Sequence, residues 1–115
     1  GESIEIKVNR EELLDIVSRV SVLSNDKFKG VKLKSDGNLL KIFSSNNDQE
    51  SAKEELELEV ANEGFEIAFN VNYLREMLNT IEDKSISIQS FGNEKSALMK
   101  TSNNDRVLVL MPVRL

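Results

Sequence analysis

The sequence repeats one pattern of apolar residues twice, and this repeat constrains the fold more than any other feature. In the first copy, apolar residues alternate with polar ones from Ile4 to Val8, which predicts a strand. Asn9 follows, with Glu12 three residues on, a spacing that resembles a capping box at the start of a helix. The next apolar residues come at helical spacing: Leu13, Ile16, Val17 and Val20. The first copy therefore predicts a strand followed directly by a helix.

The second copy lies 61 positions further along the chain, and every apolar position reappears in it. Asn70 takes the place of Asn9, so we expect it to cap a second helix. The expected strand carries Phe65, Ile67 and Phe69, and the helical stripe carries Leu74, Met77, Leu78 and Ile81. A match over so many positions indicates one structural unit that is used twice.

After each expected helix, the apolar pattern changes to the period of two that is typical of strands. In the first half, Val31 and Leu33 lead to Asp36-Gly37, a strong hairpin signal, and then to residues 39–43. A further strand carries the apolar residues Leu56, Leu58 and Val60, with Glu55, Glu57 and Glu59 on its solvent face. Three strands are therefore expected between the first helix and the second copy.

The second half continues in the same way. A strand at residues 86–88 precedes a turn at Gly92-Asn93, and another strand follows around residues 97–99. A turn at residues 103–105 then leads into the final strand at Val107. Each half thus has the order strand, helix, three strands.

Two such units in 115 residues leave room for one domain with one moderate core. We expect a single α+β domain over residues 1–115, built from two strand-helix-three-strand repeats at about 3–60 and 64–113. Its two helices should pack on one face of antiparallel sheet that is made of about eight short strands. The start, Gly1-Glu2-Ser3, lacks both an initiator methionine and the regions of a signal peptide. We therefore expect the chain to be a fragment of a longer one.

The composition narrows the possible functions. The chain has no cysteine and no histidine, which removes thiol nucleophiles, thiolate metal sites and the commonest general base. We expect no enzyme activity, no metal and no cofactor. The lack of cysteine suits a reducing cytoplasm. The net charge of −5 argues against a freestanding basic nucleic-acid binder but says nothing about local patches.

An enzyme would have to use paired carboxylates. The best candidates are Glu54 with Glu55, or Glu57 with Glu59, as acid and base. Carboxylates that alternate along a strand do share a face, but no histidine, glycine-rich phosphate loop or metal-ligand cluster accompanies them. This alternative is weaker than a binding function.

The end of the chain is unusually apolar for a terminus. Residues 108–115 read Leu-Val-Leu-Met-Pro-Val-Arg-Leu, whereas chain ends are usually polar. Pro112 has no backbone donor and fits only at the edge or end of a sheet. The final strand should therefore stop near Met111, and residues 112–115 are available to line a core or a binding surface.

Three separated segments carry a family resemblance: residues 22–31 (Val-Leu-Ser-Asn-Asp-Lys-Phe-Lys-Gly-Val), residues 69–73 (Phe-Asn-Val-Asn-Tyr) and the terminal Met-Pro-Val-Arg-Leu. With the repeat, they make the chain similar to the third, C-terminal domain of the bacterial DNA polymerase III beta subunit, the sliding clamp. The resemblance implies three such domains in a subunit and a head-to-tail homodimer that forms a ring around duplex DNA. Helices would line the hole, and sheets would form the outside.

The resemblance also implies a peptide-binding groove between the second and third domains, used by the DNA polymerase III alpha subunit, the clamp loader and repair proteins. The matching positions place Val109, Met111, Pro112 and Val113 in the groove, Arg114 and Ser96 at its polar edge, and Asn70 and Tyr73 beside it. Methionine adapts to different peptides, and proline stiffens the wall. The alternative is ordinary packing: Val109 and Met111 as core, Tyr73 as a packed aromatic and Arg114 as a solvated charge.

A second implied surface is the ring-closing interface with the neighbouring subunit. Arg19, Val22 and Leu23 match its apolar and cationic contacts, and Asp48, Glu50 and Glu54 match part of an acidic loop. Ser51 and Lys53 stand where well-known members are acidic, so the electrostatic part of closure should be weaker, while the contact through Val22 and Leu23 persists. The alternative is that this charged run is a solvated face.

Contacts with duplex DNA have the least support from individual residues. Arg10, Arg19 and Arg75 lie on the expected helices and could meet phosphates, but acidic residues share those helices. A sliding ring needs only weak, sequence-independent phosphate contacts, so sparse arginines fit the role without predicting it. The other binding function left open is a peptide-binding adaptor that does not associate with DNA. We expect the full-length protein in the bacterial cytoplasm with the nucleoid, and this fragment alone as a monomer.

Overall fold

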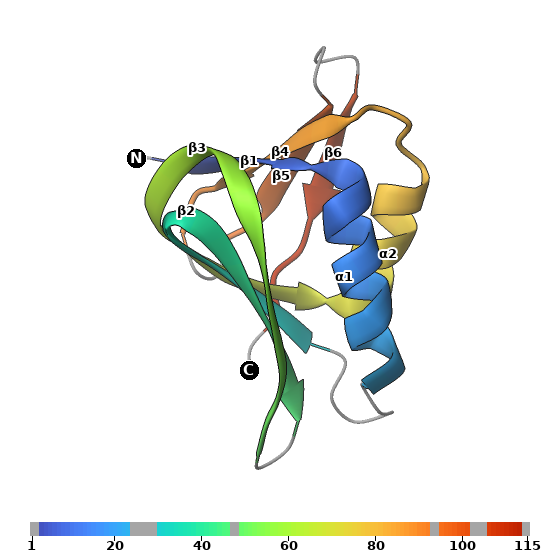
Figure 1. Ribbon diagram of the computed structural model, residues 1–115. Coiled ribbons are helices and arrows are strands. Elements are labelled where there is room, and N and C mark those ends of the chain that lie inside the picture. The colour runs from blue at the N-terminus through green and yellow to red at the C-terminus, as the bar shows by residue number, and fades with distance from the viewer. Residues whose placement is uncertain (1–2, 24–29, 47–48, 93–94, 102–105, 114–115) are drawn as a thin grey trace.

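The computed structural model describes residues 3–23, 30–46, 49–92, 95–101 and 106–113, without the side chains of residues 23, 44–46 and 49–53. This part of the chain forms two helices and six strands (Figure 1). They are β1 (Ile4–Asn9), α1 (Arg10–Leu23), β2 (Gly30–Asn46), β3 (Gln49–Asn70), α2 (Val71–Asn79), β4 (Ser85–Ser90), β5 (Ala97–Thr101) and β6 (Val107–Leu110).

Asparagine side chains cap both helices. At α1, the backbone N–H of Glu12 donates to Oδ1 of Asn9 with an N···O distance of 3.0 Å. At α2, Oδ1 of Asn70 accepts from the N–H groups of Asn72 and Tyr73, at 2.9 and 3.1 Å. The first N–H groups of a helix have no partner within it, so an Asn side chain that accepts from them stabilises the start. Both predicted caps are confirmed.

The two repeats exchange their first strands. β1, from the first repeat, pairs antiparallel with β4 of the second, and the resulting sheet has the order β1-β4-β5-β6. In the same way, residues 66–70 at the end of β3, which open the second repeat, pair with residues 30–34 of β2. Each sheet therefore contains a strand from the other repeat, which ties the two repeats together.

β2 and β3 are too long to be straight. A straight strand of the 17 residues in β2 would span roughly 56 Å, whereas the longest dimension of the molecule is 38 Å. Both strands curve back on themselves, and β3 runs around the outside of β2 (Figure 1). The bends lie at Gly37, with φ of +64°, and near Gly64, with φ of +97°, both values that favour glycine. The predicted turn at Asp36-Gly37 coincides with the first bend, but the hairpin expected there is wrong, because the residues on both sides of the bend pair with β3 and not with each other.

The expectation of about eight short strands is corrected to six in the described part of the chain, two of them long. Backbone pairing continues around the bend, where Asp36 pairs with Glu63 and Gly37 with Asn62. The segments that were expected as separate strands before and after each bend therefore form one long strand. Val60 also differs from expectation, because its side chain is 65% exposed while Leu56 and Leu58 are buried. It lies in the stretch of β3 where the register with β2 shifts, so the alternation of the preceding strand is broken there.

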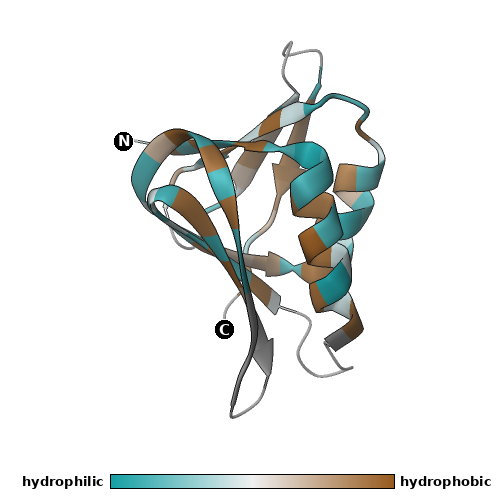
Figure 2. Ribbon diagram, in the orientation of Figure 1, coloured by the Kyte–Doolittle hydropathy of each residue, from teal (hydrophilic) through white to brown (hydrophobic). Residues whose placement is uncertain are grey.

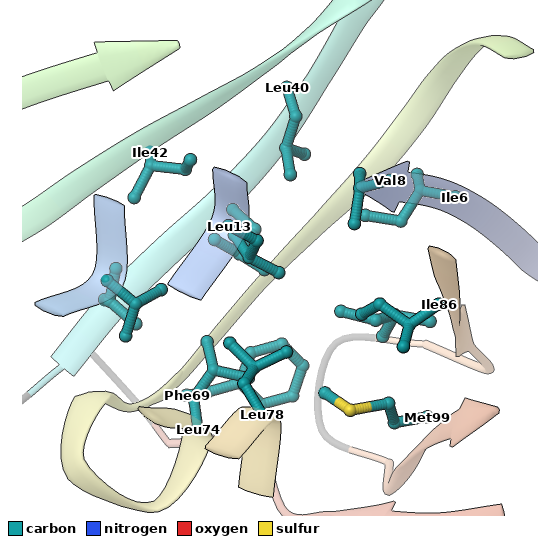
Figure 3. Close-up of a cluster of buried hydrophobic side chains, with 14 of the residues drawn as sticks. Ile6, Val8, Leu13, Leu40, Ile42, Phe69, Leu74, Leu78, Ile86 and Met99 are labelled. Atoms are coloured by element: carbon teal, nitrogen blue, oxygen red, sulfur yellow. The ribbon is translucent and has the colours of Figure 1, made fainter. Parts of the chain in front are cut away.

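The apolar stripes of both repeats enter one core. Leu13 of α1 and Leu74 and Leu78 of α2 are fully buried, and Figure 3 shows them among side chains from β1, β2, β3, β4 and β5. Figure 2 shows hydrophobic and hydrophilic residues alternating in bands along α1 and along the bent strands. The solvent-exposed face predicted for this part of β3 is confirmed, since Glu55, Glu57 and Glu59 are all exposed.

The two helices lie side by side, and the strands lie to one side of this pair (Figure 1). α1 contacts β1, β2 and β3, and α2 contacts α1 and β3. The predicted α+β class, with two helices packed against antiparallel sheet, is confirmed. Within the described ranges, no helix has the length and apolar character needed to cross a membrane.

Candidate functional site

The last strand divides its side chains between core and solvent. β6 pairs antiparallel with β5, with Leu110 opposite Ala97 and Val109 opposite Leu98. Leu110 is buried, but Val109 and the following Met111 are 56% and 66% exposed. The packing alternative for Val109 and Met111 is therefore wrong in this chain, because it is Leu110 that anchors the strand in the core.

Beyond β6, the tail lies against the strand that leads into α2. Pro112 forms an isolated antiparallel bridge with Phe69, and the backbone N–H of Val113 donates to the carbonyl of Ala68 at 2.9 Å. A proline fits such a bridge because it has no N–H to contribute to a continuous ladder. The tail is thereby held beside the residues that precede the second helix.

Asn70 and Tyr73 lie at that start of α2. The amide oxygen of Asn70 is occupied as the helix cap, so it orients the first turn. The Tyr73 side chain is 68% exposed, one turn into the helix. Tyr73 is therefore not a packed aromatic in this chain, and its ring is open to solvent.

Ser96, the residue just before β5, joins the same region. Its hydroxyl donates to the thioether sulfur of Met111, with an O···S distance of 3.2 Å. This contact restrains a side chain that is otherwise largely exposed. We define the tail surface by its described residues: Ser96, Val109, Met111, Pro112 and Val113, with Asn70 and Tyr73 at the nearby helix start. Arg114, predicted at its polar edge, lies outside the described residues.

Another exposed apolar residue lies in the last turn of the first helix. Val22 is 80% exposed, and Arg19 lies three residues earlier on α1. The guanidinium of Arg19 donates from Nε and Nη2 to the two carboxylate oxygens of Glu54, at 3.0 and 2.6 Å. We call Arg19, Val22 and Glu54 the helix-end surface. The predicted neighbour Asp48 and the side chains of Leu23 and Glu50 lie outside the described part of the chain.

The pair changes the acidity of both of its members. The hydrogen bond to Glu54 raises the pKa of the Arg19 guanidinium above its ordinary value. The same hydrogen bond lowers the pKa of the Glu54 carboxyl. Both groups are therefore held in their charged forms, which is the expected result of a charge-assisted pair with two parallel bonds.

Comparison with known families gives this geometry its context. Residues 1–114 match the family model of the DNA polymerase III beta subunit, C-terminal domain. The chain belongs to this family.

Individual members of the beta-subunit family agree with that match. The beta sliding clamp of Pseudomonas aeruginosa PAO1 is 37% identical over 108 residues, which cover 93% of this chain and 29% of that protein. The beta sliding clamp of Escherichia coli K12 is 33% identical over 99 residues, 85% of this chain and 27% of that protein. The chain thus spans less than a third of the length of these relatives.

Solved structures of beta sliding clamps have the same fold. A crystal structure from Bartonella birtlesii superposes with a TM-score of 0.89 at 34% identity, over all of this chain and 33% of that one. A Pseudomonas aeruginosa clamp bound to griselimycin gives a TM-score of 0.87 at 35% identity, over all of this chain and 31% of that one.

Two arginines that the beta-subunit resemblance places towards DNA have partners within the chain. Arg10 donates from Nε to the carbonyl of Asp83 at 2.8 Å and from Nη1 to the carbonyl of Leu78, at the end of α2, at 3.1 Å. Arg75 of α2 donates to the hydroxyl of Ser21, near the end of α1, at 3.1 Å. Neither helix has a basic residue in its own last turn, so each receives a cation from the other. A role of Arg10 and Arg75 in DNA contact stays a prediction.

Some parts of the site gave no signal in the sequence. The carbonyl of Ala68 holds the tail, but a backbone acceptor has no side-chain pattern that could reveal it. Arg19 and Glu54 are predicted to face a neighbouring subunit, yet they pair with each other across 35 positions of sequence. Only the packing of α1 against β3 brings them together.

Proposed function

We propose that this chain is the C-terminal domain of a bacterial replication clamp. In the full-length subunit it follows two similar domains, and two subunits close into a ring that encircles duplex DNA. The ring acts without catalysis: it holds the DNA polymerase III alpha subunit, the clamp loader and repair proteins near the template. Its place is the cytoplasm, with the nucleoid. The membership of the chain in the beta-subunit family supports this proposal.

The observation that carries the proposed peptide groove is a tail that is both fixed and exposed. Leu110 anchors it in the core, and the bridge at Pro112 and the hydrogen bond of Val113 fix its path. Val109 and Met111 nevertheless point into solvent. A preordered apolar surface loses little conformational entropy when a ligand binds. We propose that the tail surface forms one wall of the groove and that the second domain forms the other.

The chemistry of this wall suits several peptides. Met111 has a flexible, polarisable side chain that can repack against different apolar residues. Pro112 keeps the backbone rigid beneath it. Tyr73 offers an exposed aromatic ring, and Arg114, outside the described residues, supplies donors for a peptide carbonyl or carboxylate in this proposal.

The groove is tested in the full-length subunit by fluorescence polarisation. The probe is a labelled peptide from the clamp-binding segment of the alpha subunit of the same bacterium. Replacing Met111 and Pro112 with alanine and deleting Arg114-Leu115 should weaken binding at least about tenfold, or about 1.4 kcal/mol. Unchanged affinity would remove the tail from the site.

Val107→Ala provides the matched control. Val107 lies on the same side of β6 and is 54% exposed, but it is not assigned to the groove, so its replacement should leave affinity unchanged. Sedimentation should show that the tail variant still forms the dimer. Retention on closed circular DNA, with loss from linear DNA, distinguishes a clamp from an adaptor. An adaptor would bind the peptide and remain on neither DNA.

A further inference from the structure

The sulfur atoms of this chain are all thioethers, because the sequence has three methionines and no cysteine. Peroxides oxidise a thioether to a sulfoxide when they can reach the sulfur. The three methionines differ widely in that access. Met99 of β5 is fully buried in the core (Figure 3), Met77 of α2 is partly buried against the core, and Met111 is 66% exposed. Oxidation should therefore begin at Met111.

The sulfur of Met111 is held at the surface of the molecule. The hydroxyl of Ser96 donates to it with an O···S distance of 3.2 Å, and the next residue, Pro112, is fixed by its bridge to Phe69. A thioether sulfur has two lone pairs, so one hydrogen bond leaves the other lone pair available to an oxidant. The tail surface thus presents one reactive thioether at a fixed place.

An oxygen on this sulfur would make an apolar part of the tail surface polar. Val109, two residues before Met111, is also exposed, and Pro112 follows directly. A thioether is apolar and adaptable, whereas a sulfoxide is a polar acceptor of hydrogen bonds. A sulfoxide oxygen has more than one lone pair, so the single hydroxyl of Ser96 satisfies it only in part. An apolar peptide side chain that covered this oxygen would remove its water without replacing the hydrogen bonds, which costs binding free energy.

We propose that Met111 is a reversible oxidation site that regulates the tail surface. A hydroperoxide converts its thioether to the sulfoxide, and the groove then binds its partner peptides more weakly. The proposal rests on the groove described under Proposed function. It adds a chemical modification to that site and names the class of reactant, which is hydrogen peroxide or an organic hydroperoxide.

The oxygen transfer balances within its two reactants. A lone pair of the Met111 sulfur attacks one oxygen of hydrogen peroxide, and an S–O bond forms as the O–O bond breaks. The departing hydroxide takes the proton of the transferred oxygen and leaves as water. The sulfur loses two electrons, and the peroxide gains them. In the reverse step, two thiols become a disulfide and the oxygen leaves as water. The chain has no cysteine, so these thiols belong to a methionine sulfoxide reductase.

The test treats the full-length subunit with hydrogen peroxide and takes two measurements on the same samples. Mass spectrometry of a digest gives the sulfoxide fraction at each methionine, and fluorescence polarisation gives the affinity for the alpha-subunit peptide. Met111 should be oxidised at least about fivefold faster than Met77, and Met99 should stay unmodified. Full oxidation of Met111 should weaken peptide binding at least about fivefold. Reductases that cover both sulfoxide epimers should restore the affinity.

Met77→Leu and Met111→Leu are the matched variants, since leucine is apolar, similar in volume and free of sulfur. For each protein, the affinity after peroxide is divided by the affinity before it, so that any difference in starting affinity cancels. Met77→Leu should lose affinity as the wild type does, whereas the affinity of Met111→Leu should change less than about twofold. Met111→Gln places a polar amide near the position of the sulfoxide oxygen. Without peroxide, it should bind within about threefold of the fully oxidised wild type.

Faster oxidation at Met77 or Met99 than at Met111 would overturn the proposal. Unchanged affinity of a wild type that is fully oxidised at Met111 would do the same, as would a Met111→Gln subunit that binds like the untreated wild type. An equal loss in Met111→Leu would place the sensitive group elsewhere in the subunit.

Thermal unfolding checks that the oxidised subunit is still folded. Its midpoint should match that of the untreated protein, because the modified sulfur lies on the surface. A lowered midpoint that accounts for the lost affinity would attribute the loss to unfolding and overturn the regulation. An untreated wild type that does not bind the peptide would instead contradict the groove itself, and the regulation with it.

Discussion

Asn70 shows how one side chain can serve both folding and the proposed groove. Its amide oxygen accepts from two backbone N–H groups, which fixes the first turn of α2 and therefore the direction of Tyr73. Asn9 holds the equivalent place in the first repeat and accepts from the N–H of Glu12. The two caps form a natural pair for comparison within one chain.

Asn70→Ala should lower the free energy of unfolding by about 1–2 kcal/mol, because two helix N–H groups lose their acceptor. Asn70→Asp should retain most of the stability, since a carboxylate accepts the same bonds and suits the positive end of the helix dipole. Asn9→Ala is the comparison, with an expected loss of about 1 kcal/mol. Urea denaturation measures all three variants. An Asn70→Ala chain as stable as the wild type would show that the cap contributes nothing.

Among the elements, the bent strands matter most, because their bends let two long strands fit one small domain. At the bend of β2, Gly37 has a φ of +64°, and a Cβ built on it would meet nothing within 4 Å. Any cost of a side chain there comes from the backbone alone. Gly64 differs, since its φ is +97° and a Cβ would lie 3.1 Å from Cδ1 of Ile4.

Gly37→Ala should therefore cost about 1–2 kcal/mol, the usual penalty for a non-glycine residue in the left-handed region. Gly37→Asn should cost less, because asparagine tolerates that region better than other residues. Gly64→Ala should cost more than Gly37→Ala, because crowding against Ile4 is added to the backbone strain. Thermal unfolding provides the ranking. Equal losses at the two glycines would show that the contact with Ile4 relaxes freely.

The same elements show what the sequence can and cannot predict. The caps at Asn9 and Asn70 and the alternation in β4 and β5 are local signals, so they predict the elements correctly. The continuation of β2 through the bend at Gly37 is not a local feature, since it depends on the pairing of Gly37 with Asn62 of β3. Pairing partners far apart in the chain leave no mark in a short window of sequence.

For the site, alternation in β6 predicts that either Val109 or Leu110 faces out, but it does not choose between them. The register with β5, in which Leu110 lies opposite Ala97, makes that choice, and a shift of one residue would reverse it. The resemblance to the beta-subunit family selects Val109 and Met111, in agreement with their exposure. It gives no sign of the pairing between Arg19 and Glu54, which follows from the packing of α1 on β3.

At the scale of the whole molecule, the proposed function needs more than this chain. In that proposal, the tail surface is one wall of a groove whose other wall is the second domain, and Val22 of the helix-end surface faces a neighbouring subunit. We expect the 115-residue chain alone to sediment as a monomer at micromolar concentration and to bind the alpha-subunit peptide at least about tenfold more weakly than the full-length subunit. A single exposed valine buries too little area for a stable dimer, which needs roughly 1,000 Å² or more.

The full-length subunit, measured in the same buffer, is the control for both the sedimentation and the peptide-binding measurement. A stable dimer or ring of this chain alone would show that its own surfaces suffice for assembly, and full peptide affinity would show that the tail surface needs no second wall.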